Sequence, residues 1–291
     1  MSREGNVTEG LKKESKRIKA FREELVKRIK HHPADKVTKD EMLAMPLPDL
    51  LACYINWVSR FVKKNPRSIV VLPSVEKDPQ WTEQKEGIDT LLQKVRLGED
   101  LTQSLSLQAH KYGYVSPNSS ANPDGLIWTE DKDFLLNTMG FYHFHLGTTV
   151  VNNHVDRTNY VLFAHVTNDL FTVVAIANHD VFESDTEEMN SERTQLWETF
   201  ENYSKHPGLT HEENSIMMNG FNSKTTRKAI NCAKLIASTD PDLEKYDFLK
   251  KLYAAAGQHM PKKCKFKWEF NFLDLGVLEK REQVFFPFLK H

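Results

Sequence analysis

GFYHFHLG, residues 140–147, and TNYVLFAHVTNDLFTVVAIANHDVF, residues 158–182, decide the fold class of this chain of 291 residues. Both stretches are rich in β-branched and aromatic residues, which favour strands. They predict three strands: Phe141–Leu146, Thr158–Val166 and Leu170–Ala177. Because Asn168 and Asp169 are turn-forming residues, we expect a tight hairpin between the last two strands. This segment therefore predicts a small antiparallel sheet.

Helical patterns flank the predicted sheet on both sides. Apolar residues recur every three or four positions, which is typical of amphipathic helices, in these segments: 9–31, 50–62, 81–96, 99–111, 191–205, 224–238 and 242–256. Further short strands are expected at 68–72, 266–273 and 284–288. The order predicts an α+β fold, with a helical N-terminal part followed by a small antiparallel sheet packed with helices.

One stretch interrupts these patterns and predicts a boundary between domains. Residues 114–125 read YVSPNSSANPDG, which is rich in Pro, Ser, Asn and Gly and has no periodicity. We expect a helical region at residues 1–113, a linker at 114–125, and an α+β domain with a histidine-rich β-core at 126–291.

Composition and charge exclude several classes of protein. Its apolar stretches, such as Tyr160–Val166, are too short to cross a bilayer, so no membrane partner is expected. The first residues carry charges without an apolar core behind them, unlike a secretory signal. Three widely spaced cysteines form no CxxC pair, which favours a reducing compartment and a cytoplasmic location.

Basic residues are concentrated near the N-terminus although the formal net charge is only −1. The segment 11–30 carries many more cations than carboxylates, and four of its cations are candidate phosphate contacts: Lys12, Lys13, Lys16 and Arg17. The ordinary alternative is a solvent-exposed helix face, because charged residues usually lie on the protein surface in contact with water.

Histidines provide the strongest chemical signal in the sequence. The chain has 12 of them, and five lie between positions 143 and 179: His143, His145, His154, His165 and His179. Because side chains alternate along a strand, His143 and His145 are expected on one face. Histidine titrates near neutral pH and transfers protons, while Arg157 carries a permanent charge that suits phosphate. These residues match the needs of a metal-free ribonuclease site.

The same segment resembles a known family. The run HFHLG, followed by RTNYVLFAHVTNDLFTVVAIANHDVF, looks like the core of RelE/YafQ-type toxins over about residues 130–183. The matching positions follow the order of that core: His145, Leu162-Phe163, Asn168-Asp169 and His179-Asp180-Val181-Phe182. Members of that family are small and strongly basic, whereas this chain is long and near neutral.

The resemblance implies a fold and an activity. The fold would be of the barnase/EndoU/colicin/RelE type, and the activity that of a metal-independent endoribonuclease, a hydrolase acting as a toxin or defence effector. The implied catalytic residues are His145 and His179, joined by His143 and the more loosely aligned Arg157, with Phe182 stacking on a base. The expected partners are RNA and, as in toxin–antitoxin pairs, an inhibitory protein; residues 1–110 could instead supply the restraint.

Two other functions remain open. HFHLG also resembles the zinc-binding strand of α-carbonic anhydrases, which would make His143, His145 and His165 or His179 zinc ligands of an enzyme with an open fourth position. The second is a non-catalytic module in which the helices bind another protein. Because no P-loop, GxGxxG, GxSxG or HExxH motif is present, ATP-driven, dinucleotide and serine-hydrolase chemistry are not expected.

Overall fold

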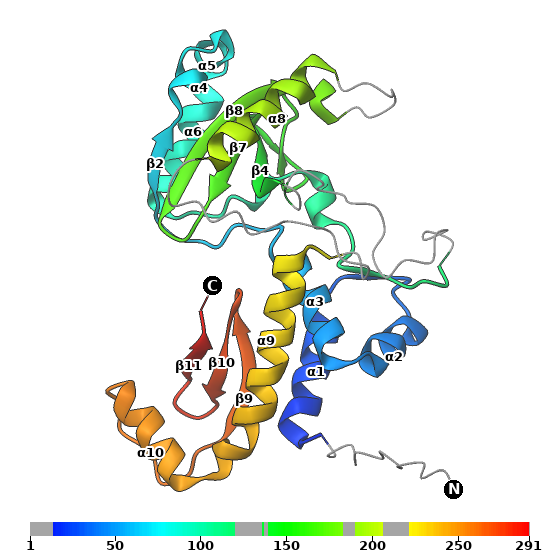
Figure 1. Cartoon of the computed structure of the whole chain (residues 1–291), viewed down its shortest axis with the longest axis vertical. Helices are drawn as coiled ribbons and strands as arrows, with labels where there is room; N and C mark the ends of the chain where they lie inside the picture. Colours follow the sequence, from blue (N-terminus) through cyan, green and yellow to red (C-terminus); the bar gives the residue numbers. More distant parts are fainter. Residues whose placement is uncertain (1–13, 120–135, 137–138, 183–189, 206–220, 291) are drawn as a thin grey trace, which may run out of the picture. The chain divides into compact units, whose positions relative to one another are not determined.

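The computed structural model describes residues 14–119, 136, 139–182, 190–205 and 221–290. It is an α+β protein in which helices precede small sheets, as the sequence predicts (Figure 1). The chain divides into two compact units, with boundaries between Arg28 and Ile29 and between Ile230 and Asn231. Among the residues described, every helix is too short or too polar to span a bilayer.

The first unit joins the N-terminal helix to the C-terminal sheet. Its elements are α1 (Lys16–Arg28), the second half of α9 (Ser223–Thr239), η4 (Asp240–Glu244), α10 (Tyr246–Ala255), β9 (Phe266–Asn271), β10 (Asp274–Glu279) and β11 (Val284–Leu289). The strands form an antiparallel sheet in the order β11-β10-β9. Phe21 of α1 packs against Phe270 of β9, with ring centroids 5.8 Å apart.

The second unit contains the histidine-rich segment. Its helical elements are α2 (Lys36–Ala44), α3 (Leu47–Val58), α4 (Pro73–Glu76), α5 (Pro79–Glu83), α6 (Lys85–Leu97), η1 (Thr102–Ser104), η2 (Leu107–His110), η3 (His179–Phe182) and α8 (Ser191–Ser204). Its strands are β1 (His31–His32), β2 (Ser68–Val71), β3 (Tyr114–Val115), β4 (Phe141–His145), β5 (Val150–Val151), β6 (His154–Val155), β7 (Tyr160–Val166) and β8 (Leu170–Asn178).

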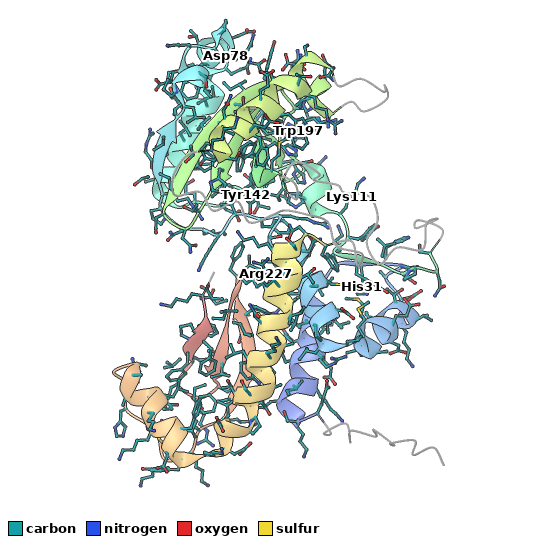
Figure 2. All side chains as sticks on the ribbon, viewed as in Figure 1. His31, Asp78, Lys111, Tyr142, Trp197 and Arg227 are labelled. Carbon is teal, nitrogen blue, oxygen red and sulfur yellow. The ribbon has the colours of Figure 1, made fainter. Side chains whose placement is uncertain are left out.

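A four-stranded sheet in the order β2-β8-β7-β4 organises the second unit. Strands β4, β7 and β8 are antiparallel, as expected, while β2 joins β8 in parallel. Side chains of α6 and the sheet form one core, which includes the partly buried Tyr142. Leu196 and Trp197 of α8 pack on the opposite face, and Figure 2 labels Tyr142 and Trp197 on their elements.

Close packing fixes α6 against the end of β4. A Cβ atom added to Gly87 of α6 would lie 2.0 Å from the backbone oxygen of Leu146, so only glycine allows this approach. The tyrosine hydroxyl of Tyr142 donates a hydrogen bond of 2.7 Å to the carbonyl of Ser59. These two contacts hold strand β4, which carries His143 and His145, against α6 and Ser59.

The division of the chain differs from the boundaries expected at residues 1–113, 114–125 and 126–291. Tyr114 and Val115 open the expected linker, yet they form the buried strand β3, paired in parallel with β1. Residues 120–125 lie outside the described part of the chain. The actual division brings α1 together with strands more than two hundred positions later, a long-range association that local composition does not reveal.

Candidate functional site

Strand β4 presents both of its histidines on the face of the sheet that α8 covers. His143 pairs with Phe163 and His145 with Val161 in the register of β4 and β7. Their ring centroids lie 6.3 Å apart, and the residues are 6% and 7% exposed. The i,i+2 spacing therefore places them as expected, although both are more deeply buried than surface histidines.

The end of β8 brings two further predicted residues to this pair. β8 runs directly into the short helix η3, which begins at His179 and ends at Phe182. The His179 ring stacks on His145 with centroids 5.4 Å apart and an interplanar angle of 30°. The Phe182 ring lies 4.9 Å from His143 and 5.8 Å from His179. The three imidazoles and the phenyl ring thus form one cluster, which we call the histidine cluster.

A tight hairpin between β4 and β7 carries Arg157 to the histidine cluster. Its two-residue turn has positive φ at Asn152 (52°) and Asn153 (65°), the backbone of a type I′ hairpin turn. Gly147 permits the close return of the chain, because a Cβ there would lie 2.1 Å from the backbone oxygen of Asp156. The exposed Arg157 follows directly, and its positive charge lowers the pKa of both His145 and His179.

Burial and neighbouring cations keep His145 neutral. Burial makes the largest contribution, the charges of His143, His179, Arg157 and His154 add to it, and the pKa of His145 falls to about 4. Its Nδ1 atom is buried and has no hydrogen-bond partner among the residues described. His145 is therefore an uncharged imidazole at neutral pH.

His179 is more accessible and has a defined tautomer. Its pKa is also lowered, by burial and then by Arg157, while a hydrogen bond to the carbonyl of Thr158 opposes the shift. That bond, 3.1 Å from Nε2 to the carbonyl oxygen, requires a hydrogen on Nε2 because a carbonyl only accepts. In the neutral ring, Nδ1 then carries the lone pair that can take up a proton.

Other predicted site residues lie elsewhere. His165 shares the face of His145, but it pairs with Phe141 in the register and its Nδ1 lies 3.2 Å from the Tyr203 hydroxyl. Four residues of strand, roughly 13 Å, separate this position from the partner of His145. The structure therefore does not bring His143, His145 and His165 together. The third imidazole beside His143 and His145 is that of His179.

Of the four basic N-terminal residues, Lys16 and Arg17 are described, and both belong to the first unit. Lys12 and Lys13 lie outside the described residues. Arg17 is held by Asp240 and Glu244, with nitrogen–oxygen distances of 2.9 and 2.5 Å. Since these contacts occupy its guanidinium, Arg17 stabilises the first unit and has little capacity left for a phosphate; Lys16 begins the same helix α1.

Sequence reasoning missed one residue beside the histidine cluster, His110, and its contact with His154. His110 of η2 packs edge-to-face on His154 of β6, with ring centroids 4.6 Å apart. The pKa of His110 is lowered by burial and by the charge of His154. His154 was visible as part of the histidine run, but nothing local links it to His110, which is more than forty positions away in the sequence.

The described part of the chain holds no group of three His, Cys, Asp or Glu side chains that could bind a metal ion. The stacked arrangement of His145 and His179 sets the rings side by side, whereas ligands of one zinc ion direct their nitrogen lone pairs at a common point about 2.0–2.1 Å away.

Comparison of the chain with protein-family models, with curated proteins and with solved structures found no match.

Proposed function

We propose that the histidine cluster is the active site of a metal-independent endoribonuclease. The observation that carries the proposal is the convergence of three imidazoles, from the end of β4 and the end of β8, beside a permanent cation. The resemblance to RelE/YafQ-type toxins supports the same activity, since it covers the same residues. A role as a toxin or defence effector, restrained by an inhibitory protein, follows from that resemblance.

The reaction that we propose is cleavage by the 2′-hydroxyl of RNA itself. A base removes the proton of this hydroxyl, the 2′-oxygen attacks phosphorus, and the bond from phosphorus to the 5′-oxygen breaks. The departing 5′-oxygen takes a proton from an acid, which leaves a 2′,3′-cyclic phosphate and a 5′-hydroxyl end. Because burial and Arg157 lower the pKa of His179, its ring is neutral at pH 7 and can serve as the base.

The remaining residues take complementary roles in this proposal. His143, whose ring lies 4.9 Å from Phe182, is the candidate proton donor to the 5′-oxygen. Arg157 would stabilise the negative charge that develops on the phosphorane-like transition state. Phe182 is 39% exposed and offers an aromatic face on which a base can stack. His145 stays neutral and holds the ring of His179 by stacking, so it is a positioning residue.

The proposal is tested by measuring RNA cleavage in the presence of EDTA. His179→Ala should lower the cleavage rate about 10²- to 10⁴-fold, since this is the usual contribution of a general acid or base. Arg157→Ala should also lower the cleavage rate. It should not unfold the protein, because the residue is exposed. His259→Ala, which removes an exposed histidine of the first unit, is the matched control and should leave the rate unchanged.

Circular dichroism of each variant distinguishes a folded protein that has lost activity from one that has unfolded. Cleavage by the wild-type protein that EDTA abolishes, or a His179→Ala variant as active as the wild type, would contradict the proposed mechanism. Expression of the wild-type protein in a bacterium should slow growth, and the His179→Ala variant should not.

A further inference from the structure

A second group of rings and cations lies in the same unit as the histidine cluster. It begins at the pair of His110 and His154 and continues to Phe61, whose ring centroid is 5.5 Å from that of His110. These three rings are all partly exposed. None belongs to the proposed acid–base machinery, so the proposed reaction does not account for their position.

Cations and a tyrosine extend this group. The ammonium of Lys30 donates a hydrogen bond of 2.9 Å to the carbonyl of His110 and lies 5.6 Å from the ring centroid of Tyr112. The Tyr112 ring in turn lies 4.8 Å from the ring of His32. A guanidinium nitrogen of Arg60 donates to the carbonyl of Tyr112 at 3.0 Å, which places a second cation here. The group therefore combines five rings with two cations, Lys30 and Arg60.

The group is electrostatically continuous with the histidine cluster. The charge of His154 contributes to the lowered pKa of His145, and the hairpin that carries His154 also carries Arg157. Two carboxylates of this unit have other partners: Asp100 pairs with Lys64 at 2.9 Å, and Asp156 accepts a hydrogen bond from the backbone of Thr149. The charge of Asp100 still raises the pKa of His110, but burial and the charges of His154 and Lys30 lower it overall.

We propose that this surface binds single-stranded RNA on one side of the cleaved bond. The surface consists of Lys30, His32, Arg60, Phe61, Tyr112, His110 and His154. Aromatic rings next to cations fit such a strand, because its bases stack on rings while its phosphates contact ammonium and guanidinium groups. Lys30 uses one of its three N–H donors on His110 and has two others for phosphate. This inference rests on the proposed function, and it adds the extent of the substrate.

Binding is measured by fluorescence anisotropy with 2′-O-methyl RNA, which cannot be cleaved because its 2′-oxygen is blocked. A dodecamer should bind much more tightly than a dinucleotide. Tyr112→Ala should weaken binding of the dodecamer about tenfold or more, since stacking of one base on an aromatic residue contributes on that scale. Lys30→Gln should weaken it less and reduce its dependence on salt.

Controls separate loss of this surface from loss of folding. Tyr246→Ala removes a tyrosine of the first unit that is 66% exposed, and it should leave binding unchanged. The circular dichroism spectrum of Tyr112→Ala should match that of the wild-type protein. This shows that the variant is folded, whether or not the protein cleaves RNA.

Three results would overturn the inference. They are equal affinity for the dinucleotide and the dodecamer, a Tyr112→Ala variant with full affinity for the dodecamer, and equally tight binding of a polyglutamate peptide. A wild-type protein that cleaves no RNA but binds the dodecamer through Tyr112 and Lys30 would support the RNA surface and overturn the proposed cleavage, so the two failures are distinguishable.

Discussion

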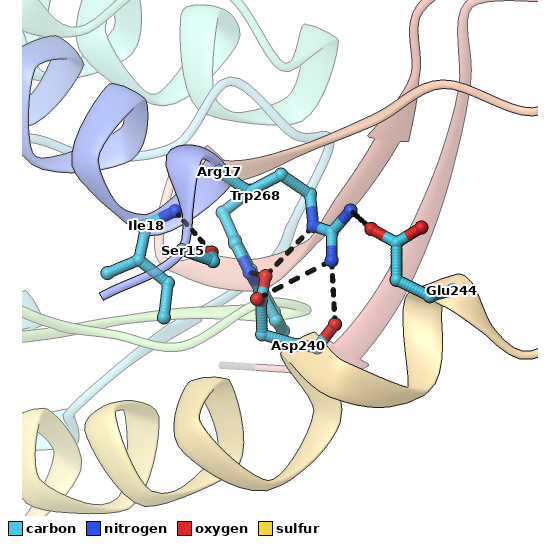
Figure 3. Close-up of polar contacts among 6 residues, drawn as sticks. All are labelled: Ser15, Arg17, Ile18, Asp240, Glu244 and Trp268. Atoms are coloured by element: carbon cyan, nitrogen blue, oxygen red, sulfur yellow. Dashed lines mark hydrogen bonds and ion pairs between the residues drawn. The ribbon is translucent and has the colours of Figure 1, made fainter. Parts of the chain in front are cut away.

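Two buried ionisable groups, Asp240 in the first unit and His145 in the second, have opposite surroundings. In the first unit, the buried carboxylate of Asp240 accepts hydrogen bonds from Arg17 at 2.9 Å and from the indole nitrogen of Trp268 at 2.8 Å (Figure 3). Burial alone would raise the pKa of Asp240, but the hydrogen bonds from Arg17, Ser15 and Trp268 outweigh it and lower the pKa. The carboxylate of Asp240 is therefore ionised in the folded protein, and its hydrogen bonds stabilise the fold of the first unit.

Glu279 of the first unit follows the same rule. It is fully buried, and its carboxylate accepts backbone N–H groups of Lys265, Arg281 and Glu282 at 2.9, 2.8 and 2.6 Å. These bonds hold the pKa of Glu279 below its usual value although burial raises it. The group closes the turn between β10 and β11, so its role is structural.

Among the described residues, His145 in the second unit has no such compensation. Every large influence on His145 opposes its charge: burial, His143, His179, Arg157 and His154 all lower its pKa. Groups whose pKa is displaced by burial and by like charges are enriched at functional sites, whereas paired ions usually serve the fold. The difference between Asp240 and His145 thus separates stabilising residues from candidate catalytic ones.

The largest effect on stability is expected at Asp240. Asp240→Ala leaves the partly buried Arg17 and the indole of Trp268 without their shared acceptor, which should lower the free energy of unfolding by about 3 kcal/mol in urea. Asp242→Ala is the matched control on the same helix η4. Its partner Lys245 is exposed, so the loss should stay below about 1 kcal/mol. Equal losses in the two variants would show that Asp240 is not the anchor of the first unit.

A smaller effect is expected from pH in the second unit. The unfolded state protonates His145 near pH 6.5, but the folded state does so only near pH 4. The unfolded state therefore binds more protons between these values, so the free energy of unfolding should fall as pH decreases from about 6.5 to about 4, by on the order of 2 kcal/mol.

The variant His145→Phe should remove part of this dependence. Its free energy of unfolding, measured in urea at pH 7 and pH 5, should change less with pH than that of the wild type. His110, His165 and His179 also have lowered pKa values, so some dependence should remain. If His145→Phe kept the full slope, burial of the neutral imidazole would not be its source.

The smallest stability effect is expected at Thr158, which ties the cluster to the strands. Its hydroxyl donates to the carbonyl of Tyr160 at 2.6 Å and accepts from the N–H of Leu146 at 3.4 Å. Thr158→Val should cost about 1 kcal/mol. It should also weaken the preference of His179 for a hydrogen on Nε2, which nitrogen NMR measures.

Thr158→Ser keeps the hydroxyl and should restore both properties. If the valine and serine variants behaved alike, the hydroxyl would not be what positions the carbonyl that faces His179.

The sequence by itself determined most of the local elements and the faces of the strands. It missed α2, and it predicted a helix at 99–111 where the chain forms only the short helices η1 and η2. β-Branched and aromatic runs predicted β4, β7 and β8 almost to their ends, and the period of two placed His143 and His145 together. The strand β10 was missed, because Asp274 and Gly276 are residue types that are depleted in strands. The fold class was correct, since the order of helices and strands is a local property.

Only the tertiary structure decided which distant residues meet. His145 lies opposite Val161 and Val161 opposite Ala177, so the antiparallel register brings the end of β8, with His179 two residues further on, back to the end of β4. The stacking of His110 on His154 and the joining of α1 to β9 depend equally on contacts between segments far apart in sequence. Periodicity reports which way a side chain faces along its own element, but the neighbours of that face are set by how the whole chain packs.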